Sequence, residues 1–149
     1  MVGQQMYIFG GLNSPSKGGN LQTLYSCHLA LSASSEKSPY LFLWDKMKAE
    51  APKARDSHTC VAFKESLILF GGQGTGRDSS FGDIHKFCVR SKTWSKLEVF
   101  GESPPGREAH VSQVIGDLMV IHGGLNQDED SFSDTWVLVG LGRKVENSD

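Results

Sequence analysis

Two arginine–histidine pairs are the first residues whose types and spacing could do chemistry. Arg55 and His58 recur as Arg107 and His110, each 52 residues later. A guanidinium is a planar fork of N–H donors that matches a carboxylate or a backbone carbonyl. Equivalent histidines in adjacent units could line a channel and hold a metal ion. We instead expect them to satisfy hydrogen bonds near the axis of the fold, because no further ligand spacing accompanies them.

Other polar clusters predict no catalytic chemistry. The acidic run 128–130 lacks the glycine and the distal glutamate of a calcium loop, so a solvated loop is expected. The glycine-rich stretch 72–76 precedes no predicted helix and lacks the Lys-Ser/Thr ending of a phosphate-binding loop. Asp83 and Asp134 are expected to fix a turn or the start of a strand. We therefore predict no catalytic residue, no bound metal ion and no cofactor.

The elements that position these residues come from an internal repeat. Further residues return in the same order, at shifts of 51 or 52. A fixed period near 50 residues indicates a repeat architecture. The recurring residues are Gly71-Gly72 with Gly123-Gly124, Ser80-Phe81 with Ser131-Phe132, and Asp83 with Asp134.

Each unit is predicted to contain four short strands, because its runs are rich in β-branched and aromatic residues and are separated by Gly, Ser and Asp. The second run, Leu67 to Phe70, is apolar at every position, which predicts a sheet covered on both faces by stacked neighbours. The glycine pair that follows allows positive φ and a close approach by a neighbouring side chain. The four predicted strands are 58–63, 67–70, 83–89 and 93–97.

The repeat predicts three blades, of which only the middle one is complete. Residues 1–46 form a partial blade without a first strand, 55–97 a full blade, and 107–140 a partial blade without a fourth strand. In the first blade, Ala30 to Pro39 is expected to be a flexible surface insertion. Residues 141–149 are expected to be a flexible tail.

These residues resemble kelch repeats. The resemblance is carried by the Arg-x-x-His motif, by an apolar strand ending in Phe-Gly-Gly or His-Gly-Gly, and by Trp94, 22 residues after the glycine pair. It implies an all-β, kelch-type β-propeller with about three four-stranded antiparallel blades. A propeller usually has 4–8 blades. We therefore expect an open fragment of a larger ring, or a short form that completes its propeller by self-association.

The resemblance also implies a binding face. Because strands alternate in direction, the loop before strand one and the loop between strands two and three emerge on the same side. In kelch proteins this side commonly receives a peptide. We therefore expect partner contacts at Arg55, Ser57, Arg77, Arg107 and Glu108. The alternative for the two repeated arginines is that they brace neighbouring blades.

The predicted function is a non-catalytic interaction module or scaffold that binds a protein or peptide, in one version as the substrate-recognition part of a ubiquitin-ligase adaptor. Two alternatives remain open. The chain could be part of a kelch-like metal-dependent enzyme, similar to glucosinolate specifier proteins or copper oxidases. It could also be a structural subunit of a larger assembly.

Composition restricts the partners and the compartment. The 149 residues carry a formal net charge of −2, so bulk charge favours neither nucleic acid nor an anionic membrane. We expect no membrane span and no signal peptide. The odd cysteine count, Cys27, Cys60 and Cys88, without a C-x-x-C motif predicts reduced thiols. This favours a cytoplasmic or nuclear location.

Overall fold

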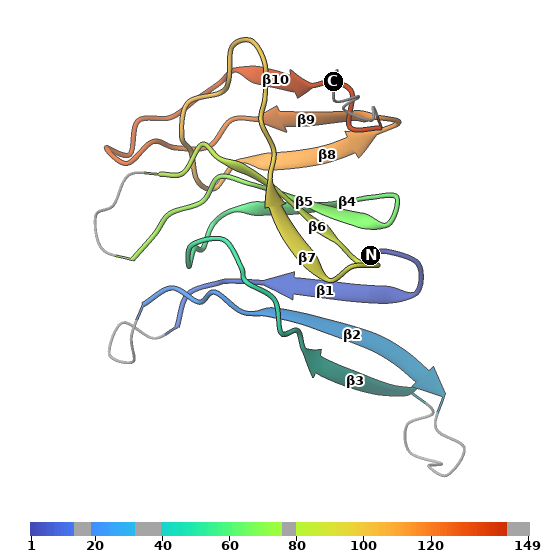
Figure 1. Cartoon of the computed structure of the whole chain (residues 1–149). Coiled ribbons are helices and arrows are strands. Elements are labelled where there is room, and N and C mark those ends of the chain that lie inside the picture. The colour runs from blue at the N-terminus through green and yellow to red at the C-terminus, as the bar shows by residue number, and fades with distance from the viewer. Residues whose placement is uncertain (14–18, 32–39, 76–79, 143–149) are drawn as a thin grey trace.

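Three antiparallel sheets follow one another along the chain (Figure 1). The structure is a computed structural model that describes residues 1–13, 19–31, 40–75 and 80–142, and these contain ten strands. The all-β prediction is confirmed. The strands are β1 (Gln5–Phe9), β2 (Leu24–Leu31), β3 (Tyr40–Lys46), β4 (Thr59–Phe63), β5 (Ser66–Phe70), β6 (Ile84–Cys88), β7 (Thr93–Lys96), β8 (Val111–Ile115), β9 (Leu118–His122) and β10 (Thr135–Leu138).

The second sheet is a complete blade with the strand order β4-β5-β6-β7. Each strand starts and ends within two residues of its predicted range. Lys64 makes the tight β4–β5 turn with φ +50°, and Gly116 does the same between β8 and β9 with φ +64°. Both turns are short enough to form β-hairpins.

The outer sheets are incomplete in the predicted way. The first sheet has the order β1-β2-β3 and no strand equivalent to β4 among the described residues. The third sheet has the order β8-β9-β10 and no described equivalent of β7. Strand β2 continues to Leu31, so it includes the first two residues of the expected insertion, while 32–39 lie outside the described residues.

Leu141, which the sequence placed in a flexible tail, is held against the third sheet. Leu141 donates its backbone N–H to the Asp117 carbonyl and packs against the apolar cluster between the second and third sheets. Residues 143–149 lie outside the described residues.

The core lies in two clusters between successive sheets. Leu67 and Leu69 of β5 pack with Phe9 of the first sheet, whereas Ile68 and Phe70 pack with Met119 and Ile121 of the third sheet. All five residues of β5 are buried. Alternate side chains of β5 therefore pack into both interfaces of the stack. Burying each such apolar side chain contributes about 1.5–3 kcal/mol to stability. The predicted two-sided strand is confirmed.

The glycine pair of the second sheet allows a close approach by the third sheet at Gly71 and by the segment before β4 at Gly72. Gly71 and Gly72 have φ of +69° and +94°. A Cβ at Gly72 would lie 2.5 Å from the Asp56 carbonyl oxygen, and a Cβ at Gly71 would lie 2.7 Å from Cε1 of His110. Only glycine fits these positions, because any larger residue would collide with backbone or with a buried ring.

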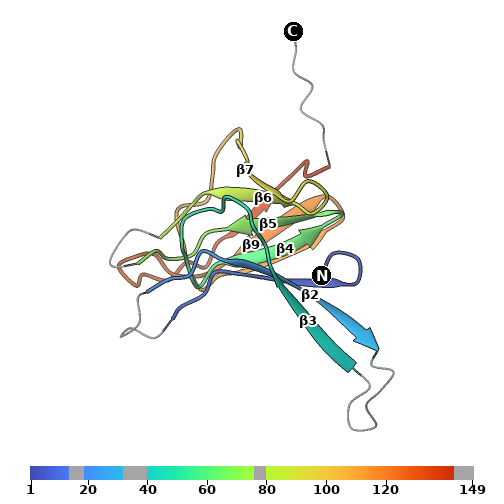
Figure 2. The same cartoon turned by 60° about the horizontal axis from the view of Figure 1, so that its bottom comes forward.

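The connecting loops gather at one end of the stack, which Figures 1 and 2 show at the left. Isolated bridges join Asp56 to Gln73 and Glu108 to Leu125. The segments before β4 and β8 therefore each pair with the segment that follows the glycine pair of the same sheet. We call this end the loop face. Among the described residues there is no helix that could cross a bilayer.

Candidate partner-binding face

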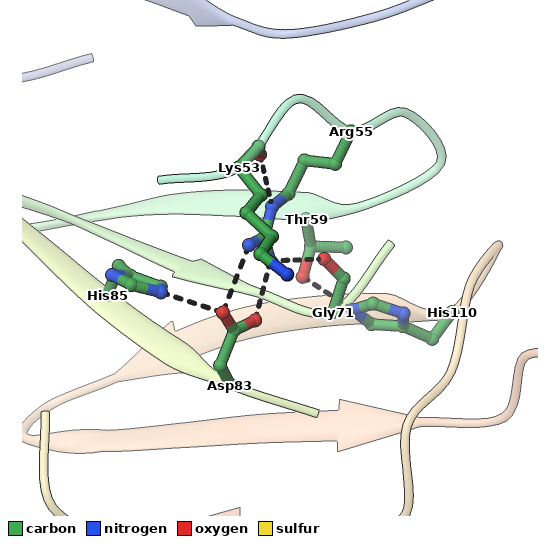
Figure 3. Close-up of polar contacts among 7 residues, drawn as sticks. All are labelled: Lys53, Arg55, Thr59, Gly71, Asp83, His85 and His110. Atoms are coloured by element: carbon green, nitrogen blue, oxygen red, sulfur yellow. Dashed lines mark hydrogen bonds and ion pairs between the residues drawn. The ribbon is translucent and has the colours of Figure 1, made fainter. Parts of the chain in front are cut away.

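Arg55 is fully buried beneath the loop face (Figure 3). Its Nη1 and Nη2 donate to the two carboxylate oxygens of Asp83 at 2.6 and 3.0 Å. Nη1 also donates to the Gly71 carbonyl at 2.9 Å, and Nε donates to the Lys53 carbonyl at 3.1 Å. The guanidinium carbon lies 4.2 Å from the centre of the Phe81 ring. All three nitrogens of the planar fork therefore donate to a partner.

Arg107 repeats this arrangement in the third sheet. It is also fully buried, and it donates to Asp134 at 2.6 and 3.0 Å and to the Gly123 carbonyl at 2.9 Å. The Phe132 ring lies 4.3 Å from the guanidinium carbon. One partner differs between the copies. The Asp83 carboxylate is 2.8 Å from Nε2 of His85, whereas Asp134 accepts from Nε1 of Trp136 at 2.6 Å.

The backbone of each arginine is bonded to the preceding sheet. Arg55 N–H donates to the Leu21 carbonyl, and the Arg55 carbonyl accepts from Gly11. Arg107 in the same way donates to Phe81 and accepts from Gly72. We call each arginine with these backbone and side-chain bonds an arginine bracket, because it joins two successive sheets.

This geometry corrects the expected role of Arg55 and Arg107. A guanidinium with 0% exposure that is already bonded to a carboxylate is not accessible to another molecule in this conformation. Both residues instead brace neighbouring blades, which was the alternative left open by the sequence.

Asp83 and Asp134 directly precede β6 and β10, as predicted, and they are the charge partners of the brackets. Burial opposes ionisation of Asp83, but hydrogen bonds from His85 and Arg55 and the charge of Arg55 hold its pKa well below the usual range. Hydrogen bonds from Arg107 and Trp136 lower the pKa of Asp134 likewise. Both carboxylates therefore stay charged and hold the brackets. The sequence analysis missed this pairing, although the two aspartates repeat together with the two arginines.

The repeated histidines are neutral groups at the sheet interfaces. Nε2 of His110 lies 2.8 Å from Thr59 Oγ1, and its ring packs on Phe70. His58 packs on Phe9 in the same way. Burial, assisted by the charge of the adjacent arginine, lowers the pKa of both histidines to about 4. Of the hydrogen bonds predicted for the two histidines, the one made by His110 is that with Thr59. The described residues contain no group of three or more His, Cys, Asp or Glu side chains placed to hold a metal ion.

Ser57 and Glu108 lie on the loop face, and Arg77 lies outside the described residues. Ser57 is exposed and has φ +52°. Glu108 is half-buried, and its pKa is raised by burial and by the carboxylates of Asp56 and Glu129. The carboxylates of Asp56, Glu108 and Glu129 therefore make this part of the face negatively charged.

A recess of about 530 Å³ opens between the loops of the second and third sheets. Asn126 orders one wall, because its Oδ1 accepts from the backbone N–H groups of Asp128 and Asp130, both at 2.9 Å. The acidic run that the sequence predicted to be a solvated loop thus has a defined turn. The recess is lined by Gln73, Gln127, Asp128 and Glu129.

Asn20 joins the first and second sheets at the loop face, and sequence reasoning missed it. Its Nδ2 donates to Asp56 Oδ1 and to the Gln73 carbonyl, both at 2.6 Å. Its backbone N–H donates to Thr75 Oγ1 at 3.2 Å. Asn20 has no counterpart in the repeated motif, so the sequence held no indication of this contact.

All three cysteines are unpaired, in agreement with the predicted reduced thiols.

Comparisons with known proteins agree with this geometry. Residues 1–140 match the KLHDC2/KLHL20/DRC7 Kelch-repeats domain. The F-box/kelch-repeat protein At1g51550 of Arabidopsis thaliana is 30% identical over 92% of this chain and 28% of its own length. Human Kelch domain-containing protein 1 is 28% identical over 83% of this chain and 34% of its own length. The chain therefore spans about a third of the length of these relatives.

A solved structure, that of YjhT, has the same fold with a TM-score of 0.58 and 25% sequence identity. The match covers 84% of this chain and 32% of the YjhT chain. The three sheets of the present chain thus correspond to part of a larger propeller. From the repeated brackets, the glycine pairs and these matches together, we conclude that the chain belongs to the kelch-repeat domain family.

Proposed function

We propose that the chain is a non-catalytic interaction module that binds a protein or peptide at its loop face. The observation that carries the proposal is the recess whose wall contains Asp128 and Glu129, because Glu129 is also close enough to Glu108 to raise the pKa of that carboxyl. Rigid sheets joined by the arginine brackets hold loops around this recess, which is the arrangement in which binding residues are typically displayed. Ser57 and Glu108 are the proposed contacts, and Arg77 stays a predicted contact from the sequence.

The chemistry of the recess selects the partner. Burial raises the pKa of Glu108, and the nearby carboxylates of Asp56 and Glu129 raise it further. A lysine or arginine side chain of a partner would relieve this repulsion and would pair with the carboxylates. The proposed ligand is therefore a protein segment or peptide with basic side chains. A role as the recognition part of a ubiquitin-ligase adaptor is one specific form of this proposal, and the similarity to an F-box/kelch-repeat protein supports it.

Binding to a panel of synthetic peptides tests the proposal. Lysine- and arginine-rich peptides should bind more tightly than acidic peptides of equal length, and the affinity should fall as salt is added. Glu108→Gln should weaken binding of the basic peptides about three- to tenfold, which corresponds to the loss of roughly 1 kcal/mol. Glu65→Gln is the matched control, since exposed Glu65 lies in the β4–β5 turn at the opposite end of the sheet.

Equal binding of acidic and basic peptides, or identical affinities of Glu108→Gln and the unmodified chain, would reject the acidic recess as the binding site. Ser57→Ala then examines the neighbouring part of the loop face, and a partner that is insensitive to both substitutions binds elsewhere.

A further inference from the structure

The outer face of the first sheet is apolar and uncovered. Strand register places Ile8 beside Tyr25, and Met6 beside Cys27, which in turn pairs with Trp44. Ile8, Tyr25 and Trp44 are 48%, 39% and 46% exposed. We call this surface the first end face. It consists of Met6, Ile8, Tyr25, Phe42 and Trp44, whereas Cys27 between Met6 and Trp44 is only 3% exposed.

The repeat shows what such a face binds. Alignment on the glycine pairs makes Met6 and Ile8 the equivalents of Leu67 and Leu69. Those two leucines are 3% and 0% exposed, because the first sheet covers them. In the same register Trp44 is equivalent to Trp94, which packs on the Phe9 ring at 5.2 Å. The first end face thus has the positions of a blade interface without the neighbouring sheet.

The third sheet has the complementary uncovered face at the other end of the stack (Figure 1). Val111, Ile115 and Val137 are 65%, 62% and 50% exposed, and we call these three residues the second end face. Ile115 is equivalent to Phe63, which is only 6% exposed because the third sheet covers it.

The glycine pair of the third sheet is also open. A Cβ at Gly71 would meet the Arg107 carbonyl at 2.6 Å, whereas a Cβ at Gly123 would meet only the Phe132 carbonyl, at 3.5 Å. The backbone conformation that admits a following sheet is therefore retained, with φ +66° at Gly123.

We propose that two copies of this chain associate head to tail, with the first end face of each copy packed on the second end face of the other. The contact continues the sheet-on-sheet interface that already occurs twice within the chain. Two such contacts related by a two-fold axis close a ring. Three sheets from each copy give six, within the usual range of about 4–8 blades for a propeller.

The first sheet is suited to a junction between separate chains. Thr23 occupies the position of Asp83, so this sheet lacks the carboxylate that holds an arginine bracket. The contact between copies would depend on apolar burial, which makes it sensitive to a charge placed on either end face.

The molar mass in solution tests this proposal. Light scattering coupled to gel filtration, from about 1 µM to about 1 mM, covers dissociation constants in the micromolar to millimolar range. The mass should rise from 16.3 kDa to twice that value. Ile8→Lys and Val111→Lys should each weaken association at least about tenfold, whereas Phe100→Lys should not, because Phe100 is 93% exposed in the linker before Arg107.

A mixture of the two lysine variants distinguishes the head-to-tail ring from a symmetric face-to-face dimer. Mixing leaves one contact intact, between the first end face of the Val111→Lys copy and the second end face of the Ile8→Lys copy. Association should therefore be partly restored. If either variant loses its β-sheet circular dichroism, Phe42→Lys or Ile115→Lys replaces it.

Four results would overturn the proposal: a monomer at every concentration, sensitivity to only one end face, no restoration on mixing, or growth beyond two copies. None of them would bear on the peptide experiment above, which concerns the loop face.

Discussion

Arg107 and Asp134 are joined by hydrogen bonds of 2.6 and 3.0 Å, the same two lengths that join Arg55 and Asp83. The same pair occurs in the second and third sheets, although the other side chain bonded to the aspartate is His85 in one and Trp136 in the other. The repeated Arg–Asp pair, and not its surroundings, therefore sets the junction between sheets. Its removal should lower the free energy of unfolding of the whole fold.

Arg55→Ala should lower the free energy of unfolding by about 2–4 kcal/mol, because Asp83 would lose its charge partner in a partly buried site. Arg107→Ala should cost less, since the Asp134 side chain is 39% exposed and that of Asp83 only 26%. Urea unfolding followed by circular dichroism measures both. Arg90→Ala, at an exposed site, should stay within about 0.5 kcal/mol of the parent.

Arg55→Lys separates charge from geometry. A lysine keeps the positive charge but cannot donate two parallel hydrogen bonds to Asp83 while also reaching the Gly71 carbonyl. We expect most of the loss seen for Arg55→Ala. Full stability of the lysine variant would show that charge alone holds the junction.

Gly72→Ala should destabilise the fold by more than the cost of positive φ alone. The new Cβ would lie 2.5 Å from the Asp56 carbonyl and 2.7 Å from Cβ of His58, so the second sheet would have to shift. Gly101→Ala is a matched control, since its φ is +93° against +94° for Gly72 and nothing lies within 4 Å of its Cβ position. We expect about 1 kcal/mol for Gly101→Ala and at least about twice that for Gly72→Ala, measured by thermal or urea unfolding. Equal effects would mean that the close approach is unimportant.

Stability should fall in two steps as the solution is acidified. His58 and His110 are neutral in the fold with pKa values of about 4, whereas the unfolded chain takes up their protons near the ordinary value of 6.5. Between these values the unfolded state binds more protons, so stability decreases as pH falls from about 6.5 to about 4, on the order of 1–3 kcal/mol per histidine. Below their ordinary value of 3.8, the lowered pKa values of Asp83 and Asp134 cause a second loss.

The double variant His58→Gln/His110→Gln should remove the first step and leave the second. Urea midpoints at intervals between pH 8 and pH 3 provide the measurement, and the pH 8 value corrects for the change in packing. A first step of unchanged size in the double variant would assign it to other groups.

Asn20→Ala should loosen the contact between the first and second sheets at the loop face. The substitution removes two donated hydrogen bonds, to Asp56 and to the Gln73 carbonyl, and a longer one accepted from Thr75 Oγ1 at 3.5 Å, and should cost about 1–2 kcal/mol. Hydrogen exchange at the Gln73 amide, which donates to the Asp56 carbonyl, should become faster. Gln4→Ala, at an exposed site, is the control and should change neither quantity.

The sequence could predict the sheets because their cause is local. Apolar runs that end in a glycine pair and recur every 52 residues define the strands of the second and third sheets, and each strand of the complete blade was predicted to within one residue at either end. The first sheet was harder, since Thr23 replaces the repeated aspartate and the β2–β3 hairpin has no repeated boundary. The predicted insertion therefore began two residues too early.

The site was predicted less well because its roles depend on which side chains meet in space. The sequence places both arginines just before a strand, at the loop face. That position is compatible with bracing two sheets and also with contacting a partner. Only their burial against Asp83 and Asp134 separates the two roles. The negative character of the face arises where Asp56, Glu108 and Glu129 converge from three loops, and no spacing in the sequence indicates this.

The arginine bracket also bears on curvature. The backbone of one arginine is hydrogen-bonded to the earlier sheet, and its guanidinium is hydrogen-bonded to the later sheet. The angle between the two sheets is therefore set by the conformation of a single residue. The curvature of the stack would then be set at each arginine bracket and would not require a closed ring. A chain built from any number of these units should follow the same arc before its ends ever meet.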